Sequence, residues 1–372
     1  GYLFNRSEYF KILNRCDQVI GELAVVTEKD FQKLQRPLEG YTLKQYINNM
    51  SEFSKKYQGD FVLAVNILKG YSDSFESIKI LSKYIKKIDP DIMVAHGYRE
   101  HVYGRIGAIK AGVPIIIQVE HNTQPYNPIY YLLSQFLTLY TDKIICVSEA
   151  VREHLCKRLF NKEKMKVIYN GFYANDYFDE TPLFERKPGV VMVARFSSQK
   201  DHETLIKSAK IMLDRGHKVP IYLVGAGKGK YINKSKNLCK KLGVQDIVHF
   251  LGRRDDVPDI LANYQISVLT THYEGLSGVV MEGMAAGNVV MATKAPGVTE
   301  LIDDGKNGFL IPPERPQYLA QRIISVIQNP KEYSYIVKNA QRFVMDDLKV
   351  DNMVDKYEEL FIQEVNRLGV EN

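Results

Sequence analysis

Two carboxylates, Glu274 and Glu282, stand eight positions apart within the stretch QISVLTTHYEGLSGVVMEGMAAG at residues 265–287. Residues 266–271 are mostly apolar and partly β-branched, which predicts a buried parallel strand. A short polar loop then carries Glu274, and Ser277 is placed to cap the helix that contains Glu282. Ligands of open parallel sheets bind beyond the carboxyl ends of the strands, so both carboxylates are expected at a binding edge.

The start of this helix suits a phosphorylated ligand. The N–H groups of Gly278, Val279 and Val280 have no partner inside the helix and favour a phosphate or diphosphate. An ionised carboxylate only accepts hydrogen bonds, whereas a polyol offers donors. We therefore interpret Glu282 as a ligand of ribose and Glu274 as a ligand of a sugar. The alternative is an ordinary strand, loop and helix with two surface glutamates.

Two cations, Arg195 and Lys200, lie five residues apart just after a predicted strand at residues 190–194. Two positive charges on one loop at the carboxyl edge of a sheet suit a diphosphate leaving group, although a solvated basic loop is the alternative. The segment GAGKGK, which begins at Gly225, lacks the spacing of a P-loop, and Tyr231 stands in place of the Mg²⁺-binding hydroxyl. We expect a backbone turn there that lines the nucleotide.

Taken together, these segments resemble family-4 retaining glycosyltransferases with the GT-B fold. The similar segments, in the same order as in that family, are VIYNG (167–171), VARFSSQK (193–200), YLVGAG (222–227), the Glu-x7-Glu stretch, and APGVTELI (295–302) with DGKNGFLI (304–311). The chain departs from the family at Gly283, Asn288 and Pro296, where Ala, Pro and Gly are usual. The resemblance implies a hexosyltransferase of polysaccharide biosynthesis. It would move a sugar from a UDP-linked donor to a hydroxyl of a glycan or lipid-linked acceptor, with retention of anomeric configuration.

The resemblance also implies roles for single residues. His121 follows a buried strand and would bind the transferring sugar, whereas a lone histidine is otherwise more often structural. His96 and His101 lie at or after the preceding strand and are candidates for facing the acceptor. Arg253 follows a strand and is a candidate for nucleotide binding, and Glu300 matches the family or simply caps its own helix. The implied catalytic residues are His121, Glu274, Arg195 and Lys200, and those for the donor nucleotide and diphosphate are Arg195, Lys200, Gly225, Arg253, Ser277, Gly278, Val279, Val280 and Glu282.

The sequence contains neither a His/Asp/Glu cluster typical of a metal site nor an acid–base pair at glycosidase spacing. We therefore expect no metal and no bound cofactor, with the nucleotide sugar acting as a co-substrate. Arg195, Lys200 and helix N–H groups would neutralise charge on the departing nucleoside diphosphate. Two other functions remain open. A GT-B nucleotide-sugar 2-epimerase would need no acceptor, and a non-catalytic sensor would bind the donor without turnover.

The elements that must position these residues alternate between strand and helix. This alternation predicts parallel-sheet α/β structure, and a length of 372 residues predicts two domains. We therefore expect two Rossmann-like parallel-sheet α/β domains (GT-B) facing a central cleft. We predict an acceptor-side domain at residues 1–175, a linker over 172–189, a nucleotide-sugar-binding domain at 188–352, and a final helix at 353–372 that returns to the first domain. The predicted elements of the second half include strands at 221–224, 247–250 and 289–292 and a short helix at 298–302.

The beginning of the chain departs from the usual opening of such a domain. A helix predicted at residues 7–16 precedes a strand at 21–27, whereas a nucleotide-binding α/β domain normally opens with a strand and a glycine-rich turn. We therefore expect the first strand to be missing. In the resembled family that turn contacts the diphosphate and the acceptor.

Charge and composition limit the other partners. The 50 Lys and Arg against 44 Asp and Glu give a net charge of +6 spread over both halves, which argues against a nucleic-acid groove and permits weak contact with anionic lipid. Four cysteines without CxxC spacing indicate free thiols in a reducing compartment. No apolar run is long enough for a transmembrane helix, and no secretory signal is visible. We expect a cytoplasmic protein, at most peripheral at the inner face of the membrane, and the oligomeric state remains open.

Two surface features leave alternatives. Residues 126–140 are rich in apolar and aromatic types, which favours a core-facing crossover helix. The other interpretation is an interfacial segment that dips toward a membrane-bound acceptor. The lysines and arginine of residues 157–166 are expected to be a solvated helix end.

Overall fold

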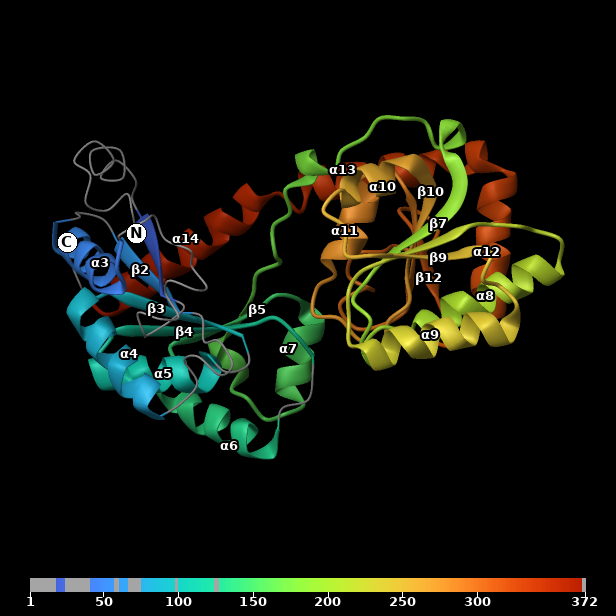
Figure 1. Ribbon diagram of the computed structural model, residues 1–372. Helices are drawn as coiled ribbons and strands as arrows, with labels where there is room; N and C mark the ends of the chain where they lie inside the picture. Colours follow the sequence, from blue (N-terminus) through green and yellow to red (C-terminus); the bar gives the residue numbers. More distant parts are fainter. Residues whose placement is uncertain are drawn as a thin grey trace. The chain divides into compact units, whose positions relative to one another are not determined.

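The computed structural model describes residues 18–23, 41–56, 60–65, 75–97, 100–123 and 127–369. They form two compact units, each built on a parallel sheet with helices packed on it (Figure 1). The first unit comprises the chain up to Val147, residues 151–168 and the C-terminal residues from Asp355. The second comprises residues 148–150 and 169–354. The predicted fold class of two parallel-sheet α/β domains is confirmed.

The described part of the first sheet has six parallel strands that lie side by side in chain order. Its central strands are buried and nearly all apolar, which is typical of a parallel sheet covered on both faces. The first strand begins at Gln18 rather than at Gly21, and the predicted helix at residues 7–16 lies outside the described residues. The strands are β1 (Gln18–Leu23), β2 (Asp60–Val65), β3 (Ile92–His96), β4 (Ile115–Glu120), β5 (Lys143–Cys146) and β6 (Met165–Val167).

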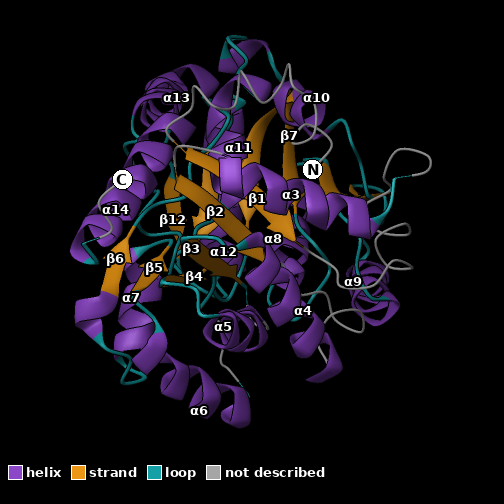
Figure 2. Cartoon of the chain, turned by 90° about the vertical axis from the view of Figure 1, so that its left-hand side faces the viewer, coloured by secondary structure: helices purple, strands orange, loops and turns teal. Residues whose placement is uncertain are grey.

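Helices alternate with these strands as the hydrophobic periodicity predicts. In α4, for example, Ile78, Leu81, Ile85 and Ile88 recur at helical spacing and are all buried. Figure 2 shows α6 at the margin of this unit, beyond α5, against which it packs. The described helices between the strands are α3 (Leu43–Lys56), α4 (Phe75–Ile88), α5 (Glu100–Ala111), α6 (Pro128–Leu137) and α7 (Glu149–Cys156).

The second sheet also has six parallel strands, but their order is β12-β11-β10-β7-β8-β9. The order reverses between β10 and β7, which are neighbours in register from Ile266 opposite Val190. Both of these residues are fully buried in the core of the unit. The strands are β7 (Lys187–Val193), β8 (Ile221–Val224), β9 (Val248–Gly252), β10 (Tyr264–Leu269), β11 (Val289–Thr293) and β12 (Phe309–Ile311).

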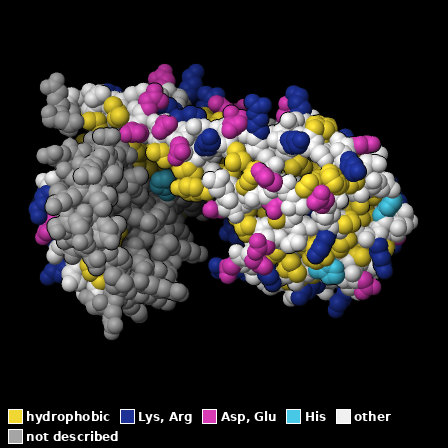
Figure 3. All heavy atoms as spheres, turned by 90° about the horizontal axis from the view of Figure 1, so that it is seen from above, with side chains coloured by type: hydrophobic (Ala, Val, Ile, Leu, Met, Phe, Trp, Pro, Cys, Tyr) yellow, Lys and Arg dark blue, Asp and Glu magenta, His cyan; other side chains and the backbone are white. Residues whose placement is uncertain are grey.

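Two groups of helices pack on this sheet. One group is α8 (His202–Asp214), α9 (Gly229–Leu242) and α12 (Pro316–Gln328), in which α8 contacts both of the others. The other is α10 (Val257–Asn263), α11 (Gly278–Ala285) and α13 (Ser334–Asp346), of which α11 and α13 are in contact (Figure 1). The charged side chains of this unit lie interspersed, without one dominant sign, on the face seen in Figure 3.

One local prediction is wrong, and one short strand was not predicted. Residues 298–302 form turns instead of a helix, because the chain leaves Gly297 with a left-handed φ of 72° and then closes short hydrogen bonds such as Leu301 N–H to Val298 C=O at 3.0 Å. The residues after it contain β12, whose three residues are too few to give a periodic pattern.

The last helix, α14 (Val350–Arg367), begins in the second unit and continues in the first from Asp355. In the first unit Leu360 and Phe361 are buried, and the Glu364 carboxylate lies 3.4 Å from the ammonium of Lys143. The C-terminal part of α14 is therefore part of the core of the first unit. None of the helices in the described ranges combines the length and the apolar character needed to cross a bilayer.

Candidate active site

The reversal of strand order between β10 and β7 places two predicted loops next to each other. The loop after β7 carries Arg195 and Lys200, and the loop after β10 carries Glu274. A bridge between Lys200 and Thr271 joins the two loops, and the N–H of His272 donates to the carbonyl of Gln199 at 2.9 Å. Ligands of such sheets bind at this reversal, so the fold brings both loops to the expected place.

Glu274 is buried and forms an ion pair with Lys200, with only 10% of each side chain exposed. The Gln199 amide donates to the Tyr273 carbonyl at 2.7 Å and lies 3.4 Å from the second Glu274 oxygen. Arg195, by contrast, is exposed. The two predicted cations therefore differ, because Lys200 is held by a carboxylate while Arg195 extends into solvent.

A second loop fixes the backbone around Glu274. The Glu274 N–H donates to the Pro296 carbonyl at 3.1 Å. Gly297 follows with φ of 72°, and a Cβ atom there would lie 2.2 Å from the carbonyl oxygen of Gly275. Only glycine fits so close an approach, which explains why this segment accompanies the glutamate loop.

The start of α11 has the predicted position. The first hydrogen bond of the helix runs from Met281 N–H to the Ser277 carbonyl, so the N–H groups of Gly278, Val279 and Val280 precede it. The prediction that Ser277 caps the helix is half right. Its backbone is extended, as an N-cap requires, but its hydroxyl makes no capping bond. The helix start thus lacks its own side-chain acceptor.

Glu282 has a partner that the sequence did not reveal. The hydroxyl of Tyr177 donates a hydrogen bond to its carboxylate, and burial with this neighbouring carboxylate raises the pKa of Tyr177 to about 12. Burial raises the pKa of Glu282, while the bond from Tyr177 lowers it. A half-buried carboxylate that is already aligned by one donor is well suited to accept from ligand hydroxyls.

The departures from the resembled family have local causes. Gly283 packs so closely on β10 that a Cβ atom would lie 2.8 Å from the Ser267 hydroxyl oxygen. The buried Asn288 amide donates to the carbonyls of Leu261 at 2.8 Å and Tyr264 at 2.7 Å. Both residues therefore serve the packing of α10 and α11 around β10.

The turn after β8 also approaches its neighbour closely. A Cβ atom on Gly225 would lie 2.1 Å from the carbonyl oxygen of Ala194, and the Gly225 N–H donates to the Gly252 carbonyl at 2.7 Å. Arg253 follows β9 at the far edge of the sheet and is 83% exposed, with Asp255 3.8 Å away. The structure thus joins Gly225 to the Arg195 loop, whereas the Arg253 side chain lies on the surface.

Glu300 does not cap its own segment, because residues 298–302 are turns. Its carboxylate accepts the N–H groups of Glu149 and Ala150, both at 2.7 Å, and the hydroxyl of Tyr169 at 2.8 Å. Residues 148–150 belong to the second unit, as Glu300 does. These three bonds give Glu300 a structural task.

In the first unit, His96 and His121 lie at the ends of the neighbouring strands β3 and β4. The Nδ1 atom of His96 and the Nε2 atom of His121 are 3.0 Å apart, so the two rings share one proton. Burial, and then His121, lowers the pKa of His96 to about 4, and burial lowers the pKa of His121. Both histidines are therefore neutral near pH 7.

The prediction that His101 faces an acceptor is wrong. It lies inside α5 and is fully buried, with Nε2 2.9 Å from the Val119 carbonyl oxygen and Nδ1 3.3 Å from a Glu120 carboxylate oxygen. The cause is that α5 begins at Glu100, so His101 lies in the first turn of the helix and points inward rather than lying in a loop after β3.

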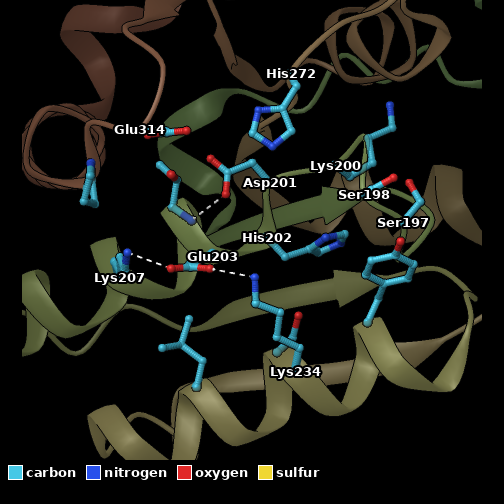
Figure 4. Close-up of a pocket in the computed structure, with 15 residues that line it drawn as sticks. Ser197, Ser198, Lys200, Asp201, His202, Glu203, Lys207, Lys234, His272 and Glu314 are labelled. Atoms are coloured by element: carbon cyan, nitrogen blue, oxygen red, sulfur yellow. Dashed lines mark hydrogen bonds and ion pairs between the residues drawn. The ribbon is translucent and has the colours of Figure 1, made fainter. Parts of the chain in front are cut away.

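The second unit contains a cavity of about 510 Å³ between the Lys200 loop, α8 and α9 (Figure 4). Within it, the Glu203 carboxylate binds both Lys207, at 2.7 Å, and Lys234, at 3.2 Å. The Asp201 carboxylate accepts the Thr204 N–H at 3.1 Å and caps α8. The acids of the cavity therefore stabilise the two helices. Among the residues described, no group of three or more His, Cys, Asp or Glu could hold a metal ion.

Comparison with known proteins agrees with this geometry. Residues 174–343 match the family model "Glycosyl transferases group 1", and residues 55–175 match "Glycosyltransferase Family 4". An uncharacterised glycosyltransferase of Methanocaldococcus jannaschii is 31% identical over 236 residues, which are 59% of this chain and 60% of the relative. The Escherichia coli UDP-Gal:alpha-D-GlcNAc-diphosphoundecaprenol alpha-1,3-galactosyltransferase is 25% identical over 309 residues, 78% of this chain and 80% of the relative.

Among solved structures, HepE of Anabaena in complex with UDP has a TM-score of 0.74 at 20% identity, covering 92% of this chain and 99% of its own. This likeness concerns the fold, whereas the two family models together account for residues 55–343. The two parallel-sheet units and the likeness to HepE show the GT-B fold, and the two family models match glycosyltransferase domains in the two halves of the chain.

Proposed function

We propose that this protein transfers a sugar from a UDP-linked donor to a hydroxyl of a glycan or lipid-linked acceptor, with retention of anomeric configuration. The observation that carries the proposal is the meeting, at the reversal between β7 and β10, of the Lys200–Glu274 pair with the Arg195 loop. The E. coli relative named for a UDP-sugar and a diphosphoundecaprenol acceptor, and the UDP complex of HepE, support this choice of substrates.

Different groups of the site bind different parts of the proposed donor. The N–H groups at the start of α11 take the diphosphate, and Arg195 supplies the solvent-facing cation beside it. Glu282, aligned by Tyr177, accepts from the ribose hydroxyls. Glu274 accepts from hydroxyls of the sugar, and the ion pair with Lys200 orients its carboxylate.

The chemical step rests on stabilising the leaving group. As the bond between the sugar and the diphosphate breaks, negative charge develops on UDP, and fixed donors and a cation lower the barrier. We assign this task to Arg195, Lys200 and the α11 start, without a metal ion or bound cofactor. His121, neutral and oriented by His96, is assigned to the transferring sugar.

Calorimetric titration with UDP tests the donor site. Arg195→Ala should weaken UDP binding about 10- to 100-fold, because a hydrogen bond to a charged group contributes about 1.5–3 kcal/mol. Arg215→Ala, an equally exposed arginine at the end of α8, is the matched control and should bind as the wild type does. Equal UDP affinity of the Arg195 variant and the control would refute the assignment.

Product analysis tests the reaction. Wild-type protein incubated with a UDP-sugar and a polyprenyl-diphosphate-linked sugar should form a longer glycolipid whose new linkage keeps the anomeric configuration of the donor. Conversion of the donor sugar without any acceptor would instead show an epimerase. Binding without turnover of any acceptor would show a sensor.

A further inference from the structure

Helix α6, with the sequence PIYYLLSQFL, contains no charged residue and exposes most of its large apolar side chains, although Leu137 is buried. Positions i, i+3, i+4 and i+7 of a surface helix normally face the core when they are apolar. In α6 and the turn after it, these positions face solvent. The exposed fractions are 68% for Ile129, 64% for Leu132, 41% for Leu133, 57% for Phe136, 72% for Leu139 and 52% for Tyr140.

The opposite face of α6 makes polar contacts. The guanidinium of Arg105 is fully buried and donates to the Ser134 hydroxyl at 2.7 Å and the Thr141 hydroxyl at 2.9 Å. The hydroxyls of Tyr130 and Tyr103 lie 2.8 Å apart. Rotation of α6 to bury its exposed apolar side would leave a buried arginine without these acceptors, so the helix is fixed with Leu132 and Leu133 outward.

Leu159 extends this apolar surface. It follows α7 with a left-handed φ of 59° and is 83% exposed. This is the position after a helix at which glycine is favoured, because a side chain there strains the backbone. Tyr131 and Gln135 of α6 both donate to the Arg158 carbonyl, at 2.5 and 2.8 Å, and a depression of about 250 Å³ is lined by both Leu139 and Leu159. Stability of the fold does not explain an exposed leucine here.

Basic residues border the same surface. Residues 157–166 contain five Lys or Arg and one acid. Lys157 and Lys162 are exposed, and the ammonium of Lys164 donates to the carbonyls of Thr138 at 2.9 Å and Thr141 at 2.7 Å. The cations therefore lie beside the end of the apolar stripe. Apolar side chains bordered by cations complement a bilayer, whose acyl region is apolar and whose anionic head groups attract Lys and Arg.

We propose that the stripe on α6 and its following turn, together with Leu159 and Lys157 to Lys166, docks the first unit onto a membrane surface containing anionic lipid. We call these residues the docking surface. The long apolar side chains enter the region below the head groups, and the exposed Lys157 and Lys162 bind the phosphates. This inference does not depend on the proposed function, although a lipid-linked acceptor would lie in the same membrane.

Co-sedimentation with vesicles tests the docking surface. The wild type should bind phosphatidylcholine vesicles that contain phosphatidylglycerol, and bind less as salt is added. The double variant Leu132→Ser/Phe136→Ser should bind at least about tenfold more weakly, because two large apolar groups no longer leave water. Lys157→Gln/Lys162→Gln should bind about fivefold more weakly for each charge removed, and only to vesicles with the anionic lipid.

The matched control is Val354→Ser/Ile362→Ser, which changes two similarly exposed apolar residues on α14 and should bind vesicles as the wild type does. Circular dichroism and melting temperature should show that all variants are folded, and UDP affinity should be the same in all of them. Equal vesicle binding by the wild type and the Leu132/Phe136 variant would overturn the proposal. A second result would also overturn it: the wild type does not bind vesicles and forms a dimer in analytical ultracentrifugation, whereas the Leu132/Phe136 variant is a monomer. A second copy of the chain would then cover the surface.

Discussion

The Lys200–Glu274 ion pair gives the sharpest quantitative prediction, and Lys200→Met is the perturbation. Only 10% of each side chain is exposed, so the methionine variant leaves a buried carboxylate without its cation. Removing one partner of a buried pair costs about 3–5 kcal/mol of unfolding free energy. Replacing both partners, in Lys200→Met/Glu274→Gln, removes both charges and should be close to neutral by comparison.

The assay is equilibrium unfolding in urea, followed by circular dichroism, of the wild type, both single variants and the double variant. The coupling energy between the two residues should be several kcal/mol. An exposed pair in the same unit, Lys210–Asp214, supplies the control, because its side chains are 40% and 56% exposed. Its coupling should be about 0.3–0.5 kcal/mol.

Additivity decides the outcome. If the two single effects at Lys200 and Glu274 sum to the double effect within about 0.5 kcal/mol, the residues act independently. That result would refute the inference that Lys200 holds the Glu274 carboxylate. It would also remove the reason for proposing that Lys200 orients Glu274 toward the sugar.

Three further predictions follow from the same two units. Gly297→Ala should destabilise the second unit and lower UDP-sugar affinity, measured by melting and calorimetry, because the new methyl would contact a carbonyl at 2.2 Å. Tyr177→Phe should weaken UDP binding less than Glu282→Gln does, since it removes only the group that aligns the carboxylate. Lowering the pH from about 6.5 to about 4 should reduce the unfolding free energy of the wild type more than that of His96→Gln. His96 binds a proton in the unfolded state over this range, whereas in the folded state its pKa is lowered to about 4.

The outcomes that would contradict these predictions are specific. An unchanged melting temperature of the Gly297 variant would mean that the loop relaxes freely. A loss of UDP affinity in Tyr177→Phe as large as that in Glu282→Gln would make the tyrosine a ligand in its own right. Parallel loss of urea stability with falling pH in wild type and His96→Gln would show that this histidine does not resist protonation.

Much of the site could be predicted because each loop follows a recognisable strand. Glu274, Lys200 and Arg195 all come directly after apolar runs, and parallel strands end at one edge of a sheet. The local sequence pattern does not give the order of the strands in the sheet. The direct pairing of Lys200 with Glu274 therefore could not be predicted and is seen only in the structure. Tyr177 lies in the aperiodic segment before β7, and its partner Glu282 is distant in sequence, so no local signal links them.

Other features could not be predicted because burial depends on tertiary context. The sequence of α6 favours a core helix by composition, but Ser134 and Leu137 form the buried face, and Leu132, Leu133 and Phe136 lie on the outer face. The decisive residue is Arg105 on a different helix, whose buried guanidinium fixes the orientation. The burial of His101 could not be predicted because α5 begins at Glu100, and the ends of helices are the least certain part of a sequence pattern.

The path of α14 has a consequence for the order in which the protein forms during synthesis. The ribosome makes the strands of the first sheet before the second unit, yet Leu360 and Phe361, which are buried in the first unit, are made only after it. The whole second unit must emerge before the first can cover this apolar surface. The domain translated first is therefore finished last, and until then its uncovered surface is the part of the nascent chain most in need of a chaperone.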